Sequence, residues 1–317
     1  MKRQAQTLMI SLWILAILTI LAVGTGHRVS MALRMSRYHK DSLKALSLAK
    51  AALNLAIVEI EKDANDYDTL HEGWSDNESA FKAITLTKSP GEFATVSFLF
   101  FGEDKKPEVV YGLQDAERRV NINTASRQML LALLEKPGAA AAEDIVDNIL
   151  IWRGDMPDDN RIYDNLGYAC KGSAFSKAEE LNLVKDFTMQ EYREIKNFIT
   201  VYGGNLININ TVSAKVLGIW TRGIAKKLGT DESFAGSVAE KILQLRKIKE
   251  YFKDKDEIDV PLTTAEETGI FNVLMNNITL QSDIFLIEVT GNSSKIKRKI
   301  EAVYSRKEKK ILDWHES

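Results

Sequence analysis

Four aspartates in the middle of the chain are the residues best suited to bind a metal ion. They lie in the stretch WRGDMPDDNRIYDNLGY (residues 152–168) and are Asp155, Asp158, Asp159 and Asp164. Calcium takes about six to eight oxygen ligands, often from flexible loops that are rich in carboxylates. The spacing is not that of an EF-hand, but the composition predicts a calcium site. The alternative is a solvated acidic loop that Arg153 and Arg161 partly neutralise.

Residues typical of enzyme active sites are few and scattered. The one cysteine, Cys170, can form neither an internal disulfide nor a thiolate metal cluster. No Gly-x-Ser-x-Gly elbow, Walker loop or His-Glu-x-x-His motif occurs. The histidines have no metal-ligand spacing and are His27, His39, His71 and His315. We therefore expect a protein without enzymatic activity and without an organic cofactor.

One phrase occurs twice. VNINTAS begins at Val120, and ININTVS begins at Ile207. The shared Asn-Ile-Asn-Thr-x-Ser reads as a short extended entry into a helix, and two copies indicate a duplicated helical module rather than a solenoid. An Asn or Thr side chain at such a place can accept a free N–H of the first helical turn. The phrase therefore predicts a helix N-cap at Asn123 or Thr124 and another at Asn210 or Thr211.

The repeated phrase is also similar to the opening of helix-hairpin-helix modules, which contact nucleic-acid backbones through a glycine-bearing hairpin. The following stretches, LLEKPGAAAAEDI and WTRGIAKKLGTDE, lack a tight Gly-x-Gly turn. The chain also has 42 Lys and Arg against 44 Asp and Glu, without the basic surplus of a nucleic-acid binder. We expect no nucleic-acid partner. The alternative is an exported, membrane-anchored DNA-binding protein that uses Arg222, Lys226 and Lys227.

The N-terminal region positions everything that follows. Residues 7–26 carry no charge, and about 20 helical residues span the roughly 30 Å core of a bilayer. Lys2 and Arg3 precede them, which predicts a cytoplasmic N-terminus and export of the rest. The alternative is a cleaved secretory signal with a cut near residues 22–24, although its apolar region is normally about 7–15 residues.

Residues 28–62 continue the same helix. They contain no proline or glycine, and apolar residues recur at three- and four-residue steps. We predict one uninterrupted helix of about 55 residues, lipid-embedded in its first half and amphipathic in its second. Its predicted contacts with partner helices are Leu46, Leu53, Ile57 and Ile60.

Strand-like runs flank a long helical region. FATVSFLFF and EVVYGL precede it, and DIFLIEVTG and KIKRKIEAVYS follow it, joined by the hairpin signal GNSS. We therefore predict an α+β protein. Its parts are a leader and transmembrane segment (1–26), the second half of the helix (27–63), a small sheet (64–113 and 283–306), an inserted α-helical domain (114–282, with modules of about 114–203 and 204–282) and a charged tail (307–317).

In this order, these stretches resemble the minor pseudopilin K subunits of type II secretion systems (general secretion pathway protein K). The likeness spans nearly the whole chain. Its carriers are LMISLWILAILTILAVG with RYHKDSLKALSLAKAALNLAI, then QDAERRVNINTAS, WRGDMPDDNRIYD ahead of FSKAEELNLVKDFTMQEY, and FITVYGGNLININTVSAKVL. The resemblance implies a pilin-like fold. A long N-terminal helix packs on a small antiparallel sheet, and the inserted all-α domain contains two related helix-hairpin-helix or SAM-like modules.

The resemblance also implies a function and a place. Such a subunit is a non-enzymatic part of the pseudopilus tip, where it initiates and caps assembly for protein export across the outer membrane. The implied partners are the I- and J-type minor pseudopilins and the assembly platform of the pseudopilus. The implied location is the bacterial inner membrane, as a single-pass protein with its C-terminal domain in the periplasm.

Individual residues are implied as well. Prepilin peptidase would cut between Ala5 and Gln6 and methylate the new N-terminus, with Ala5 standing where the family usually has glycine. Ile10 replaces the glutamate that most pilins pair with a neighbouring N-terminus. A subunit without that buried acid needs no partner above it, which suits a tip, and Ile10 would contact a partner helix. Family members bind calcium in the globular part, and the matching positions are Asp155, Asp158, Asp159 and Asp164.

Overall fold

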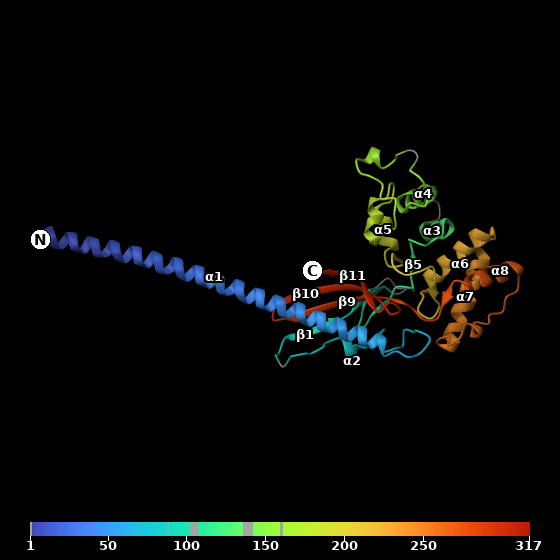
Figure 1. The fold of residues 1–317 in the computed structure, drawn as a ribbon, viewed down its shortest axis with the longest axis horizontal. Helices are drawn as coiled ribbons and strands as arrows, with labels where there is room; N and C mark the ends of the chain where they lie inside the picture. The colour runs from blue at the N-terminus through green and yellow to red at the C-terminus, as the bar shows by residue number, and fades with distance from the viewer. Residues whose placement is uncertain (1, 88, 102–106, 136–141, 159–160) are drawn as a thin grey trace.

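A long rod carries a head at one end (Figure 1). The computed structural model describes the chain apart from residues 1, 88, 102–106, 136–141 and 159–160. Helix α1 (Lys2–Glu61) runs for 60 residues without interruption, so it is about 90 Å long. It passes through Gly24 and Gly26 without a break, which confirms the predicted continuity of the membrane segment with the amphipathic segment.

The second half of α1 lies on a five-stranded antiparallel sheet. The strand order is β1 (Glu92–Val96), β9 (Ile284–Ser293), β10 (Ile296–Ser305) and β11 (Lys310–Glu316), and β4 (Gln114–Asp115) also pairs with β9. The short helix α2 (Glu78–Phe81) precedes β1, and β2 (Phe98–Phe101) pairs with β3 (Pro107–Val110) in a separate hairpin. The predicted α+β fold is therefore confirmed.

Small side chains let α1 approach the sheet closely. Its fully buried alanines recur at three- and four-residue steps and are Ala45, Ala49, Ala52 and Ala56. Beneath them, Gly291 of β9 lies so near the helix that a Cβ atom there would be 1.9 Å from the carbonyl oxygen of Ala45. A glycine is therefore required at this crossing, because any side chain would collide with the helix backbone.

The prediction of a charged tail at residues 307–317 is wrong in its structure. Lys310–Glu316 form strand β11, which pairs with β10 from Ser305↔Lys310 to Ile300↔Glu316. Lys50 of α1 forms an ion pair with Glu316 at 2.8 Å, which holds the strand against the rod. The basic run before the strand forms the turn between β10 and β11, so the charges mark a hairpin and not a loose end.

The region between β4 and β9 is a helical domain with one continuous core. Its first part runs β5 (Val120–Asn121), α3 (Arg127–Leu134), α4 (Ala142–Arg153), η1 (Asp164–Leu166), η2 (Ala178–Leu183), α5 (Met189–Ile195) and β6 (Ile199–Thr200). Its second part runs β7 (Ile207–Asn208), α6 (Ala214–Leu228), α7 (Glu232–Lys249), η3 (Lys255–Glu257), α8 (Ala265–Met275) and β8 (Ile278–Thr279).

Each part of the helical domain closes on itself by a parallel strand pair. β5 pairs with β6, and β7 pairs with β8. The two parts meet where α3 packs on α6, and Gly223 allows this approach because a Cβ there would lie 3.0 Å from Cα of Met129. The repeated phrase thus begins two units of the same strand-to-strand plan.

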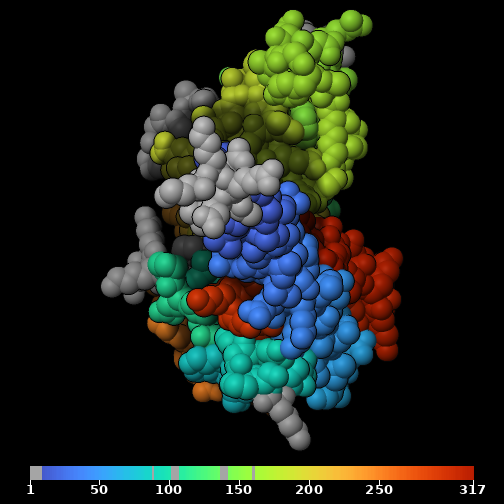
Figure 2. Space-filling model, turned by 90° about the vertical axis from the view of Figure 1, so that its left-hand side faces the viewer, coloured from blue at the N-terminus to red at the C-terminus, as the bar shows by residue number. Residues whose placement is uncertain are grey.

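The helical domain enters and leaves the sheet at paired positions. The chain departs from β4 and returns into β9, where Gln114 lies opposite Leu286. The domain stands at the end of the molecule away from the N-terminus (Figure 1). Viewed along the rod, the helices of its first part project well to one side of α1 (Figure 2).

Candidate assembly surface

The first half of α1 is exposed, and every residue from 9 to 40 is solvent-accessible. Its large apolar side chains are exposed by about half or more, for example Trp13 at 65% and Leu21 at 58%. Within the described residues, this is the one helix long and apolar enough to cross a membrane. A continuous run of exposed apolar side chains is unfavourable in water, so the segment fits a single membrane anchor.

Ile10 lies on this exposed segment, and its side chain is 59% exposed. It is therefore accessible to a partner helix or to lipid, and its contact with a partner helix stays a prediction. The proposed cleavage position between Ala5 and Gln6 falls in the first turns of α1, but these two side chains lie outside the part of the structure that is described.

The second half of α1 has two faces, and the prediction of its partner-contacting residues is wrong for two of them. Leu53 and Ile60 are 1% and 0% exposed in the core between α1 and the protein's own sheet. Leu46 and Ile57 are half-buried against the same core. Periodicity identified an apolar face correctly, but that face is occupied within the chain, and this leaves none of these four fully free for another subunit.

A second apolar set faces outward from the rod. Leu43, Leu55 and Val58 are 66%, 44% and 43% exposed. This set, together with the exposed first half of α1, forms what we call the outer stripe. It was missed because the sequence shows two overlapping apolar faces in this part of the helix, and only the sheet decides which one is covered.

A shallow groove of about 850 Å³ borders the outer stripe on one side. α1 contributes Leu43, Leu48 and Ala51, and the segment before β1 contributes Leu86. Lys44 and Glu92 also line it and form an ion pair at 2.5 Å. The groove can accept apolar side chains from a neighbouring helix, since its walls are mostly aliphatic.

The repeated phrase holds the helical domain together through matching hydrogen bonds. In the first copy, the amide of Asn123 donates to the Phe175 and Val201 carbonyls and accepts from the Phe175 N–H. In the second copy, Asn210 donates to the carbonyl of Phe252 and accepts from its N–H. Each asparagine therefore pairs with the backbone of a distant segment as a neighbouring strand would.

An arginine side chain braces each copy of the phrase. Arg153 Nη1 donates to the carbonyls of Ile122 and Ala125, and Arg246 Nη1 donates to those of Ile209 and Val212. These carbonyls belong to the turn before each helix. Because the same bonds occur at equivalent positions of both units, the repetition in sequence is explained by two identically braced turns.

The predicted N-caps are wrong by two or three residues. The cap of α3 is Ser126, whose hydroxyl accepts from the N–H of Met129, and that of α6 is Ser213, which accepts from Val216. The four predicted residues precede the helices, and their side chains do not cap them. They are Asn123, Thr124, Asn210 and Thr211. Both serines are part of the repeated phrase, so the signal was present but was assigned to the wrong member.

Thr211 instead belongs to the joint between helical domain and sheet. Its hydroxyl donates to Asp115 of β4 at 2.5 Å, and Ser282 donates to the same carboxylate oxygen at 2.8 Å. Burial raises the pKa of Asp115 despite these hydroxyl donors. Burial, followed by the nearby Asp115 carboxylate, raises the pKa of Glu117 to about 8. The joint therefore contains two buried carboxylates, those of Asp115 and Glu117.

The predicted calcium loop does not assemble a ligand set among its described residues. Asp155 forms an ion pair with the buried Arg153, and Asp158 accepts the N–H of Ile162 at 2.8 Å. Asp164 begins η1 and is exposed, while Asp159 lies outside the described residues. Asp155, Asp158 and Asp164 do not converge on one point, so these three residues do not fit a bound metal ion as arranged here.

Two of the three basic residues considered for DNA binding are engaged within the protein. Lys226 forms ion pairs with Glu135 at 2.8 Å and Glu232 at 2.6 Å. Arg222 donates to the carbonyls of Gly218 and Ala132. Only Lys227 of the three is exposed. The geometry therefore offers no cluster of free cations at this helix end for a phosphate backbone.

Comparison with known proteins supports the fold. A chain in the crystal structure of the GspK–GspI–GspJ complex, from the type 2 secretion system of enterotoxigenic Escherichia coli, matches with a TM-score of 0.64 and 14% sequence identity. The match covers 89% of this chain and 99% of that one. No family model and no curated protein matches the sequence. At this identity the likeness establishes a pseudopilin-like fold over most of the chain.

Proposed function

We propose that this chain is a minor pseudopilin of a type II secretion system and acts at the tip of the pseudopilus. One observation carries the proposal: a single helix joins an exposed apolar segment of membrane-spanning length to the core of the head. Such a subunit waits in the bilayer through its first half. It then enters a bundle of similar helices, because that bundle can cover the same apolar surface.

The shape of the head suits the end of a fibre. The helical domain stands beyond the rod and projects to one side of it (Figures 1 and 2). A further subunit stacked above would have to occupy the space that this domain fills. Steric exclusion alone therefore ends growth at this subunit, while the outer stripe below stays available to the subunits that follow.

The partners in this proposal are other minor pseudopilins, of the I and J types, and the platform that assembles the pseudopilus. The fold likeness to a chain of the GspK–GspI–GspJ complex supports this choice of partners. The N-terminus would lie in the cytoplasm and the head in the periplasm. Leader removal between Ala5 and Gln6, with methylation of Gln6, belongs to the same proposal and is tested by mass spectrometry of the N-terminal peptide.

Site-directed cross-linking tests the interface. Cys170 is replaced by alanine, and single cysteines are placed at Leu55 and Val58 of the outer stripe. A matched control places one at Ile248 of α7, which is 80% exposed but lies on the helical domain. We expect cross-links to co-expressed I- or J-type pseudopilins from the two α1 positions and none from the control. Exclusive self-cross-linking at all three positions would contradict the proposal.

A further inference from the structure

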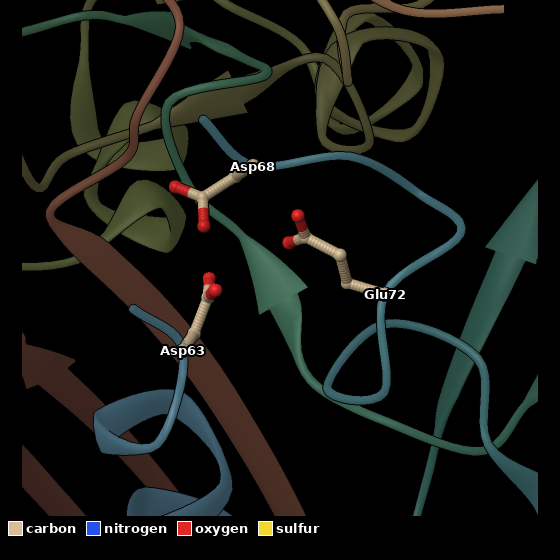
Figure 3. A group of neighbouring side chains, drawn as sticks. All are labelled: Asp63, Asp68 and Glu72. Carbon is tan, nitrogen blue, oxygen red and sulfur yellow. The ribbon is translucent and has the colours of Figure 1, made fainter. Parts of the chain in front are cut away.

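Three carboxylates meet in the loop that follows α1. They belong to Asp63, Asp68 and Glu72, and one oxygen of each lies within 4.8 Å of the others. Figure 3 shows the three side chains pointing toward a common space from different parts of the loop. Like charges at this separation repel one another strongly when partly buried, so the arrangement needs a compensating charge.

Asp68 supplies an independent sign that this space is suited to a cation. Its side chain is 0% exposed. Oδ2 accepts hydrogen bonds from the N–H of Ser282 and from Arg306, but Oδ1 is buried without a partner among the described residues. An unpaired buried carboxylate oxygen is costly, and native proteins rarely leave one without a hydrogen bond or an ion.

The local charge does not balance. Arg306 contacts Asp68 and lies 3.4 Å from Asp63, while Glu72 accepts hydrogen bonds from neutral donors, the side chains of Asn65 and Trp74 and the backbone of Thr69. Three carboxylates thus face one guanidinium among the described residues, which leaves two negative charges. The last turn of α1 contains no basic residue, and the negative end of the helix dipole lies next to Asp63.

We propose that Asp63, Asp68 and Glu72 bind one divalent cation, and that Ca²⁺ is the best fit. All three donors are carboxylate oxygens, the ligands that Ca²⁺ prefers, and no histidine or cysteine belongs to the group to favour a transition metal. The site lies on an irregular loop, which suits the flexible coordination of Ca²⁺ better than the strict octahedron of Mg²⁺. Loop carbonyls and water complete the shell.

The position gives the ion a structural task that is independent of the proposed function. Asp68 accepts a hydrogen bond from the N–H of Ser282, where the helical domain returns to the sheet. It also accepts one from Arg306, which follows directly after β10. An ion here would link the loop after α1, through Asp68, to Ser282 at the base of the helical domain and to Arg306 at the end of β10. The direction in which the head points from the rod would then depend on bound Ca²⁺.

Calcium binding to the full-length protein in detergent tests the site. After treatment with a chelator, titration with CaCl₂ should show a saturable site, and a hundredfold excess over Kd should raise Tm by roughly 5 °C. MgCl₂ should bind at least about tenfold more weakly. Tb³⁺ adds a local probe, because Trp74 lies 2.6 Å from Glu72 and can transfer excitation energy to an ion bound there.

Variants locate the ion. Glu72→Gln and Asp63→Asn should each weaken Ca²⁺ binding at least about tenfold and abolish the rise in Tm, since each removes a charged ligand. The matched control is the double variant Asp158→Asn, Asp164→Asn in the other acidic loop, which should bind as the wild type does. Wild-type protein that shows no Ca²⁺-dependent change overturns the proposal. So does loss of binding in the control with retention in Glu72→Gln.

Discussion

Replacement of Gly291 tests how the rod is held on the head. A Cβ atom at Gly291 would lie 1.9 Å from the carbonyl oxygen of Ala45 and 2.8 Å from the amide nitrogen of Ala49. Both are backbone atoms of α1, and neither can rotate away as a side chain can. In Gly291→Ala, α1 must therefore move outward by more than 1 Å, because ordinary contact begins at about 3.4 Å.

The expected cost follows from what that movement loosens. The buried alanines of α1, together with Leu53 and Ile60, pack directly on β9 and β10. Overpacking a core typically costs about 1–3 kcal/mol, and a clash between two backbones lies at the upper end. We therefore expect the free energy of unfolding to fall by about 3 kcal/mol.

Urea unfolding of the full chain in detergent, followed by tryptophan fluorescence, measures this loss. Trp74 is a suitable reporter because it is buried in the same core against Phe285. The matched control is Gly218→Ala, within α6, where a Cβ meets no atom within 4 Å. The control should be stabilised by about 0.5–1 kcal/mol. Equal stability of Gly291→Ala and wild type would refute the close packing described.

Three further perturbations address the helical domain and its joint. Asn210→Ala leaves the N–H and carbonyl of buried Phe252 unpaired and should lower the free energy of unfolding by about 3 kcal/mol in the same assay. Ser213→Ala removes the cap that accepts the N–H of Val216 and should cost about 1 kcal/mol, as a smaller shift of the same transition. The pKa of Glu117 is raised from 4.5 to about 8, so the folded protein holds this proton more tightly than the unfolded chain. Its contribution to the free energy of unfolding is therefore complete below pH 4.5 and is lost as the pH rises through 8. Stability should therefore fall over this range, and Glu117→Gln should flatten the fall when melting temperatures are compared from pH 5 to pH 9.

The main lines of the fold were predictable from local patterns. An uncharged run followed by a proline- and glycine-free amphipathic stretch is sufficient to predict α1, because both properties lie in consecutive residues. The hairpin of β9 and β10 has alternation and a turn signal between its strands. What these patterns could not provide is the partner of each face, so Leu53 and Ile60 were assigned to another subunit although the protein's own sheet covers them.

The errors at the repeated phrase have a different cause. Asn123 and Asn210 are good capping residues by type, but their amides pair with backbone segments far away in the sequence. The group of Asp63, Asp68 and Glu72 was missed because these residues read simply as the polar end of a helix. Their significance depends on Arg306 and Ser282, more than 200 positions later, which supply too few donors to satisfy them.

The pairing of Gln114 with Leu286 has a consequence for how this molecule can change over time. Neighbouring strands are about 5 Å apart, so a tight turn could bridge that gap if everything between were deleted. The end of β4 and the start of β9 are already paired as antiparallel neighbours, so the remaining strands would keep their order. The helical domain and the part built from α1 and the sheet are therefore separable in evolution: the domain can be enlarged, halved or exchanged while α1 and the sheet keep their packing.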